Sequence, residues 1–166
     1  MGMMATYYQS PKGATDMAHS LTRVLVHGVF STKDRSPVIA EEWQGRLHQY
    51  VGGIVENLDS VALAIGGIDN HIHVAFVLPS TRSLADFIGK LKANASKWVN
   101  NQKMLPNRFA WQTGYGAFSV SESKLDTVLA YIANQKQHHE KMTYEEEIRK
   151  LALLHKIPFD EKYLLG

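Results

Sequence analysis

The sequence predicts an α+β domain with a ferredoxin-like split βαβ fold: a four-stranded antiparallel sheet with helices on one face, followed by two further helices. Three observations predict it. The expected elements follow the order β-α-β-β-α-β-α-α along the chain. Two of the strands are separated only by Asp69 and Asn70, which makes them antiparallel neighbours. Apolar residues recur at every second position in the strands and at helical spacing in the helices.

The length and composition indicate a single globular domain. The chain has 166 residues, of which 45% are hydrophobic and 20% charged. Residues 1–16 have no helical or strand period, so we expect a leader or flexible extension before one domain over residues 17–166. The net charge of +2 permits nucleic-acid binding without predicting it, because binding depends on how the charges cluster.

Several classes of protein are excluded by what the sequence lacks. There is no cysteine, which excludes a disulfide framework and thiolate metal sites. The apolar runs are far too short to span a bilayer, and no segment resembles a secretion signal. We therefore expect a cytoplasmic protein.

The first half of the domain contains a strand, a helix and a strand pair. Residues 21–32 are rich in β-branched side chains and predict a strand, with His27 on one face and Val26 and Phe30 on the other. Residues 41–58 predict a helix, because Trp43, Leu47, Tyr50, Val51 and Ile54 recur at helical spacing. Residues 60–68 and 71–78 are the two antiparallel strands.

The second half is expected to be mainly helical. Residues 83–101 predict a helix with an apolar stripe, and residues 116–121 predict the fourth strand. Residues 123–141 predict one continuous helix, opened by a capping pattern of Ser123 and Asp126. The last helix, residues 143–156, begins with Thr143 and Glu146 in the same pattern and is followed by Pro158.

Two histidines at the start of a core strand are the first candidate site. His71 and His73 are one residue apart, so they project from one face of the strand, while Ile72 and Val74 point to the helices. Two adjacent imidazoles suit joint metal ligation. A pair of edge histidines without a ligand explains the same spacing, and the motif alone favours that interpretation.

A second group of polar residues lies on the expected helix 123–141. Tyr131 and Gln135 are four residues apart and share a helix face, and His138 lies one turn further on nearly the same line. Taken alone, these residues are explained as well by a tyrosine at the core margin and a solvated glutamine. His27 and His139 are interpreted as hydrogen-bonded structural histidines.

Together, these motifs resemble a known family. The segment "DNHIHVAFVLP" resembles the His-hydrophobe-His motif of the HUH endonucleases. The segments "VLVHGVFSTKDRSPVI", "FAWQTGYGAFSVSES" and "YIANQKQHH" are similar to the single-tyrosine transposases of bacterial insertion sequences, the IS200-like family. The resemblance extends from about Met17 to Leu165.

The resemblance implies a role for each matching residue. His71, His73 and Gln135 correspond to the metal ligands, with Mg²⁺ or Mn²⁺ as the cofactor, and Tyr131 corresponds to the nucleophile. The implied activity is cleavage and rejoining of single-stranded DNA through a 5′-phosphotyrosine, on element ends that often carry a hairpin. Relatives form homodimers whose sheets join, and in several the tyrosine helix serves the partner's active site. His138 is a candidate for proton transfer.

The path of the DNA is predicted less directly. A polar stripe on the helix 83–101, with further basic residues, can meet phosphates, and an ordinary solvated face explains it equally well. Two aromatic residues near the fourth strand can stack on unpaired bases, although packing in the sheet is at least as probable. The phosphate candidates are Lys90, Asn94, Lys97, Asn101, Arg82, Lys92 and Arg35, and the stacking candidates are Trp111 and Tyr115.

Two other functions fit the same sequence. A domesticated relative would use identical chemistry on repeated palindromes of its host genome, without moving an element. A non-catalytic ferredoxin-like module would bind nucleic acid without cleaving it. The intact set of His71, His73, Tyr131 and Gln135 argues against the second of these.

Overall fold

The computed structural model of the protein describes residues 21–160, so the expected extension at residues 1–16 lies outside the described part. Its centre is one antiparallel sheet with the strand order β2-β3-β1-β4. The strands are β1 (Val24–Ser31), β2 (Ala62–Gly67), β3 (His71–Leu78) and β4 (Gly116–Val120). This order confirms the split βαβ prediction, because β3 lies between β1 and β2, and β1 lies between β3 and β4.

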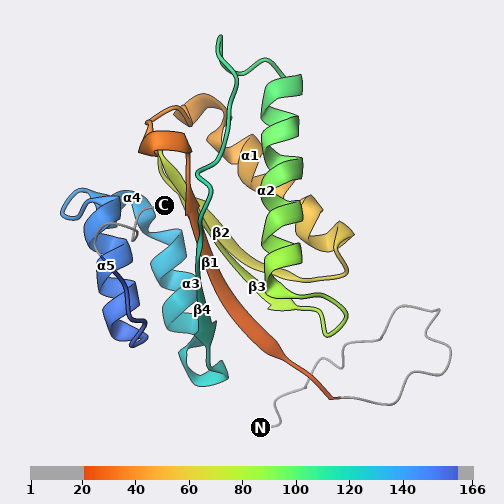
Figure 1. Ribbon diagram of the computed structural model, residues 1–166, viewed down its shortest axis with the longest axis vertical. Coiled ribbons are helices and arrows are strands. Elements are labelled where there is room, and N and C mark those ends of the chain that lie inside the picture. Colours follow the sequence, from red (N-terminus) through yellow and green to blue (C-terminus); the bar gives the residue numbers. More distant parts are fainter. Residues whose placement is uncertain (1–20, 161–166) are drawn as a thin grey trace, which may run out of the picture.

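Helices cover both faces of this sheet (Figure 1). Helices α1 (Glu41–Asn57) and α2 (Leu84–Asn101) lie on one face. Helices α3 (Leu125–Ala133), α4 (Gln135–His139) and α5 (Tyr144–Leu154) lie on the other face. Short 3-10 turns, η1 (Lys33–Arg35) and η2 (Glu122–Lys124), follow β1 and precede α3. No helix within residues 21–160 is long and apolar enough to cross a membrane.

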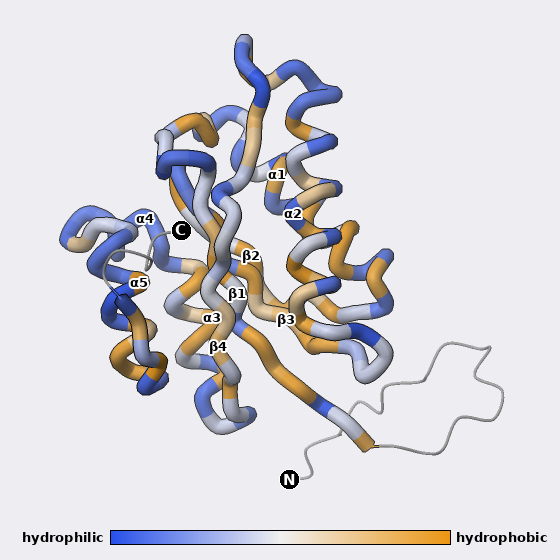
Figure 2. Tube along the Cα trace, viewed as in Figure 1, coloured by the Kyte–Doolittle hydropathy of each residue, from blue (hydrophilic) through white to orange (hydrophobic). Residues whose placement is uncertain are grey.

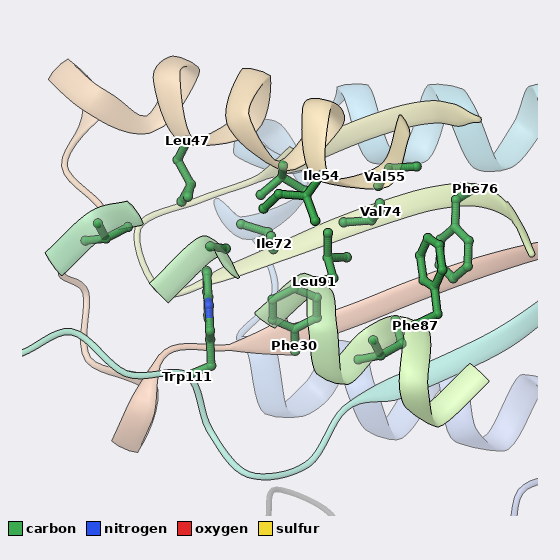
Figure 3. Close-up of a cluster of buried hydrophobic side chains, with 14 of the residues drawn as sticks. Phe30, Leu47, Ile54, Val55, Ile72, Val74, Phe76, Phe87, Leu91 and Trp111 are labelled. Carbon is green, nitrogen blue, oxygen red and sulfur yellow. The ribbon is translucent and has the colours of Figure 1, made fainter. Parts of the chain in front are cut away.

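The main core lies between the sheet and helices α1 and α2 (Figure 3). The side chains of Ile72, Val74 and Phe76 enter it from β3 and are fully buried. Phe76 stacks on Phe87 of α2 with ring centroids 4.3 Å apart. Each such side chain contributes roughly 1.5–3 kcal/mol when it leaves water. This packing fixes which face of β3 is turned away from the helices α1 and α2, and the two histidines lie on that face.

A smaller apolar cluster joins the opposite face of the sheet to α5. It consists of Val29, Phe118, Tyr144, Ile148 and Leu151. Beside this cluster the same face carries the buried histidines His27, His71 and His73. In Figure 2, β2 and β3 are mostly hydrophobic in colour. The expected alternation on β1 is confirmed, since Val26 and Phe30 belong to the main core and Val29 to this second cluster.

The prediction of one continuous helix over residues 123–141 is wrong. The structure has the 3-10 turn η2, then α3, then a break at Asn134 (φ −104°, ψ 24°), then α4. The Asn134 side chain donates to the carbonyl of Ala130, a local bond of the kind that competes with helix continuation. The capping pattern of Ser123 and Asp126 does not form, because α3 begins after Lys124 without a side-chain cap.

The prediction for the last helix is confirmed at its start. Thr143 and Glu146 form a complete capping box at the beginning of α5. An ion pair of 2.7 Å between Arg35 and Glu145 also ties α5 to the turn that follows β1. The first turn of α5 thus has a capped start and one ion pair to η1.

Candidate active site and metal centre

The two histidines of β3 lie side by side on the face covered by α3, α4 and α5. Both His71 and His73 are 0% exposed, and their ring centroids are 5.0 Å apart. Their position follows from the strand period, because Ile72 and Val74 are held in the main core on the other face. The sequence-based placement of the pair on one face is therefore correct.

Each histidine is oriented by a bond to its Nδ1 atom. Nδ1 of His71 donates to Oδ1 of Asn70 at 2.7 Å. Nδ1 of His73 forms a hydrogen bond of 2.8 Å with Nε2 of His27 on the neighbouring strand. Such bonds fix the ring orientation and leave Nε2 directed at the site, as in metal-binding histidines. His27 therefore has the structural role that the sequence indicated, and that role is to position His73.

Helix α4 brings two side chains to these Nε2 atoms. Oε1 of Gln135 lies 3.2 Å from Nε2 of His71, and Gln135 is 1% exposed. Nε2 of His139 lies 3.1 Å from the same glutamine oxygen. Gln135 thus stands where the family resemblance implies a metal ligand. His139 stands beside it in the polar group, where the sequence indicated only a structural histidine.

Glu147 of α5 completes the group from the opposite side. Its Oε2 atom lies 3.3 Å from Nε2 of His71, 3.3 Å from Nε2 of His73 and 3.0 Å from Nε2 of His139. Its Oε1 atom accepts a bond of 3.1 Å from the amide of Gln135. The carboxylate is 1% exposed. His71, His73, His139 and Glu147 thus offer ligand atoms that all lie within 4.8 Å of one another.

Tyr131 lies over the same group. Its hydroxyl donates a hydrogen bond to Oε1 of Glu147, and its ring centroid is 5.9 Å from that of His73. The ring of His138 packs on Tyr131, with the ring centroids 4.4 Å apart.

The close crossing of α3 over β2 depends on Gly66, because a Cβ atom there would lie 2.2 Å from the carbonyl oxygen of Ile132.

Burial and charge set the protonation of the group. Burial lowers the pKa of His73 to about 4, against the opposing pull of Glu147. Burial, with the nearby charge of His73, lowers the pKa of His27 to about 3. Burial alone would raise the pKa of Glu147, but contacts with His139, His71 and His73 outweigh it and hold the pKa well below its usual range. Burial, and then the Glu147 charge, raise the pKa of Tyr131.

The donor set fits a divalent metal ion. Because Nδ1 of His71 donates to Asn70, a neutral His71 presents the lone pair of Nε2 to the oxygens of Gln135 and Glu147. Nε2 of His73 is also buried and makes no hydrogen bond within the described part of the chain. Lone pairs that point at the same position, with no hydrogen between them, repel one another. A cation bound at that position removes the repulsion. This His/Glu group can therefore hold a divalent metal.

The basic residues predicted to contact DNA have unequal surroundings. Lys90 pairs with Asp86, and Arg82 binds both Asp86 and the carbonyl of Leu58. Lys92 donates to three carbonyls of residues 112–114. These three side chains thus have partners within the chain.

The remaining candidates differ in exposure. Lys97 is exposed and has no hydrogen-bond or ion-pair partner recorded within residues 21–160, and it lines a hollow of about 760 Å³ that also contains Asn101. Asn94 is exposed but donates to the carbonyl of Lys90. Trp111 is 9% exposed and packs on Phe30, which favours the packing role. Tyr115 is 41% exposed.

Two residues of the site were missed in the sequence. Glu147 lies among Tyr144, Ile148 and Leu151 on the buried face of α5. A carboxylate on an apolar helix face is costly unless it is paired, and that was the available signal. His139 follows Gln135 by four residues, and this helical spacing was the available signal for it.

Comparison with known proteins identifies the family of the chain. Residues 20–135 match the model of the protein family described as "Transposase IS200 like". Among curated proteins, none matches the sequence significantly.

Two solved structures share the fold. One is described as a candidate transposase from Deinococcus radiodurans R1; it is 19% identical, with a TM-score of 0.58 over 74% of this chain and 98% of that chain. The other is described as a REP-associated tyrosine transposase bound to a REP hairpin; it is 11% identical, with a TM-score of 0.55 over 76% of this chain and 74% of that one. At these identities the likeness concerns the fold.

Proposed function

Because the chain belongs to the IS200-like transposase family, we propose that it cleaves and rejoins single-stranded DNA through a 5′-phosphotyrosine intermediate. One observation carries the proposal: the hydroxyl of Tyr131 bonds to a buried group of histidines and a carboxylate that suits a divalent metal. A tyrosine is a weak nucleophile at neutral pH, so it needs such a group beside it to attack a phosphodiester.

His71, His73 and Gln135 would hold Mg²⁺ or Mn²⁺. The bound ion would supply Lewis-acid polarisation of the scissile phosphate and neutralise its negative charge. The chain itself keeps the ligands in place: Asn70 and His27 orient the two imidazoles, and α3 and α5 cover them. This burial removes competing water from the site.

Tyr131 would attack the scissile phosphorus through its phenolic oxygen. A bond forms between this oxygen and phosphorus while the bond from phosphorus to the 3′ oxygen breaks, leaving a 5′-phosphotyrosine and a 3′-hydroxyl. In net terms the phenolic proton passes to the 3′ oxygen, and His138, whose ring packs on Tyr131, is the neighbouring group that would carry it. Attack by a second 3′-hydroxyl reverses the step and joins a new strand without an external energy source.

Part of the bound DNA, away from the scissile phosphate, would lie along the hollow beside α2, on the other side of the sheet from Tyr131. Lys97 of α2 and Arg108 of the following loop both line it, and both are exposed. Cations without local partners are free to bind phosphate oxygens. A hairpin-containing strand is the preferred substrate, and the solved relative described as bound to a REP hairpin supports this choice.

Trapping of the covalent intermediate tests the proposal. Incubation with hairpin-bearing single-stranded DNA and Mn²⁺ should give a protein–DNA adduct that survives denaturing electrophoresis. Tyr131→Phe should abolish the adduct, because the Tyr131 hydroxyl bonds to Glu147 of this group. Tyr144 also lies beside the histidines, with its ring centroid 4.8 Å from that of His71, so an adduct that persists in Tyr131→Phe would point to this second phenol. Tyr50→Phe is the control, since Tyr50 stacks on Trp98 of α2 on the other face of the sheet. No adduct with the wild type, or an adduct with Tyr131→Phe, would contradict the mechanism.

A second candidate function uses the same chemistry on repeated palindromes of the host genome. The fold shared with a REP-associated transposase is the observation that favours it. The position of the gene separates the two functions: element ends beside every copy support transposition, and a solitary gene among palindromes supports host processing.

We also propose that the chain forms a homodimer. Light scattering of the purified chain would test this oligomeric state.

A further inference from the structure

We propose that Glu147 is a metal ligand, a carboxylate that α5 supplies to the ion held by His71 and His73. The inference rests on the function proposed above, because that function requires an ion at this place. It adds a ligand that lies beyond residues 20–135, the part of the chain that matches the family. It also gives α5 a direct role in the site.

The distances between the ligand atoms match those expected around one ion. Ligands about 2.1 Å from an ion in octahedral geometry lie roughly 3 Å from their neighbours. Oε2 of Glu147 is 3.3 Å from Nε2 of both His71 and His73, and Nε2 of His71 is 3.2 Å from Oε1 of Gln135. The carboxylate therefore has the spacing of an adjacent ligand, already in place on the same centre.

The charge of the site supports the same conclusion. His71, His73 and Gln135 are neutral ligands, so alone they give the ion no negative partner. Mg²⁺ and Mn²⁺ are hard ions that prefer oxygen ligands, with carboxylates foremost. Glu147 supplies both the hard oxygen and the missing charge. An octahedral ion bound by these four side chains keeps two positions for phosphate oxygens or water.

The environment of Glu147 explains why it needs a cation. The carboxylate is 1% exposed, and within residues 21–160 its recorded ion pairs are with histidines alone. A buried carboxylate is costly unless a positive charge compensates it. Arg35 pairs with Glu145 of the same helix, at 2.7 Å. A bound divalent ion would satisfy Glu147 directly.

Calorimetric titration of the full chain with MnCl₂ tests the inference. Glu147→Gln should weaken Mn²⁺ binding by about 100-fold, the upper end of the range known for residues that support metal ligands. Glu145→Gln is the matched control on the same helix, and its affinity should equal that of the wild type. If Glu147→Gln binds Mn²⁺ as tightly as the wild type or more tightly, the carboxylate is no ligand and the inference is wrong.

A second measurement needs no variant. If Glu147 ligates the ion, Mn²⁺ should slow hydrogen exchange of the α5 amides in the wild type, because the metal then ties α5 to β3. Unchanged exchange in α5 despite Mn²⁺ binding would overturn the inference even if Glu147→Gln fails to fold. If the wild type binds no Mn²⁺, the proposed metal chemistry is wrong as well. If Mn²⁺ binds with the same affinity in the wild type and in Glu147→Gln, only the role of Glu147 as a ligand is wrong.

Discussion

Tyr131 of α3 donates its phenolic hydrogen to the carboxylate of Glu147, which belongs to α5. The bond links the candidate nucleophile to the group of histidines through a residue on a different helix. It restricts the rotation of the tyrosine side chain and keeps its oxygen beside the ligand atoms. The site is thus assembled from the sheet, from α3 and α4, and from α5.

Removal of a histidine ligand should abolish stabilisation by metal. In the wild type, Mn²⁺ at 100 times its Kd should stabilise the fold by about 2.7 kcal/mol, because it binds only the folded chain. Mn²⁺ should therefore raise the Tm of the wild type. This rise should be absent in His71→Ala and should persist in His48→Ala, because His48 is a half-buried residue of α1 on the other face of the sheet. A Tm that still rises with Mn²⁺ in His71→Ala would contradict a metal site at this position.

Replacement of His27 should weaken metal binding without removing a ligand. His27 holds Nδ1 of His73 at 2.8 Å and so fixes the direction of Nε2. His27→Phe should lower Mn²⁺ affinity by roughly 10–100-fold, the usual cost of losing a supporting contact. Calorimetric titration measures this, and the Tm of the metal-free variant checks its fold. An unchanged affinity would mean that His73 keeps its orientation without this partner.

A methyl group at position 66 should displace the tyrosine helix. The Cβ of Gly66→Ala would meet the backbone oxygen of Ile132, which cannot move unless α3 moves with it. We expect a loss of about 1–3 kcal/mol in the free energy of unfolding, measured in urea, together with loss of the DNA adduct. Gly89→Ala is the control: its Cβ meets nothing within 4 Å, and it should stabilise α2 by up to about 1 kcal/mol.

Lys97 should contribute more to DNA binding than Lys90, although both lie on α2. Lys90 is paired with Asp86, whereas Lys97 faces the hollow with no partner recorded in the described region. Lys97→Ala should weaken binding of single-stranded DNA and reduce the slope of log Kd against log salt by about 0.7, the value for one phosphate contact. Fluorescence anisotropy at several salt concentrations measures it. A larger change for Lys90→Ala would place the DNA elsewhere.

The sequence predicted the features that repeat at short range. The alternation of β3 placed His71 and His73 on one face, and the apolar partners Ile72 and Val74 confirm it. The spacing of four residues placed Tyr131 and Gln135 on one side of a helical segment. The Thr143 cap located the start of α5. Each of these follows from local backbone geometry, which residues close in sequence determine.

The contacts between distant segments needed the tertiary structure. Glu147 shares no local pattern with His71, and only the packing of α5 against the sheet brings its carboxylate 3.3 Å from Nε2 of that histidine. Lys92 likewise has its partners in residues 112–114, which are distant in the sequence. The sequence by itself therefore determined the fold class, the histidine pair and the tyrosine face. The packing of α3, α4 and α5 decided which further side chains join them, because burial and distance are properties of the folded chain.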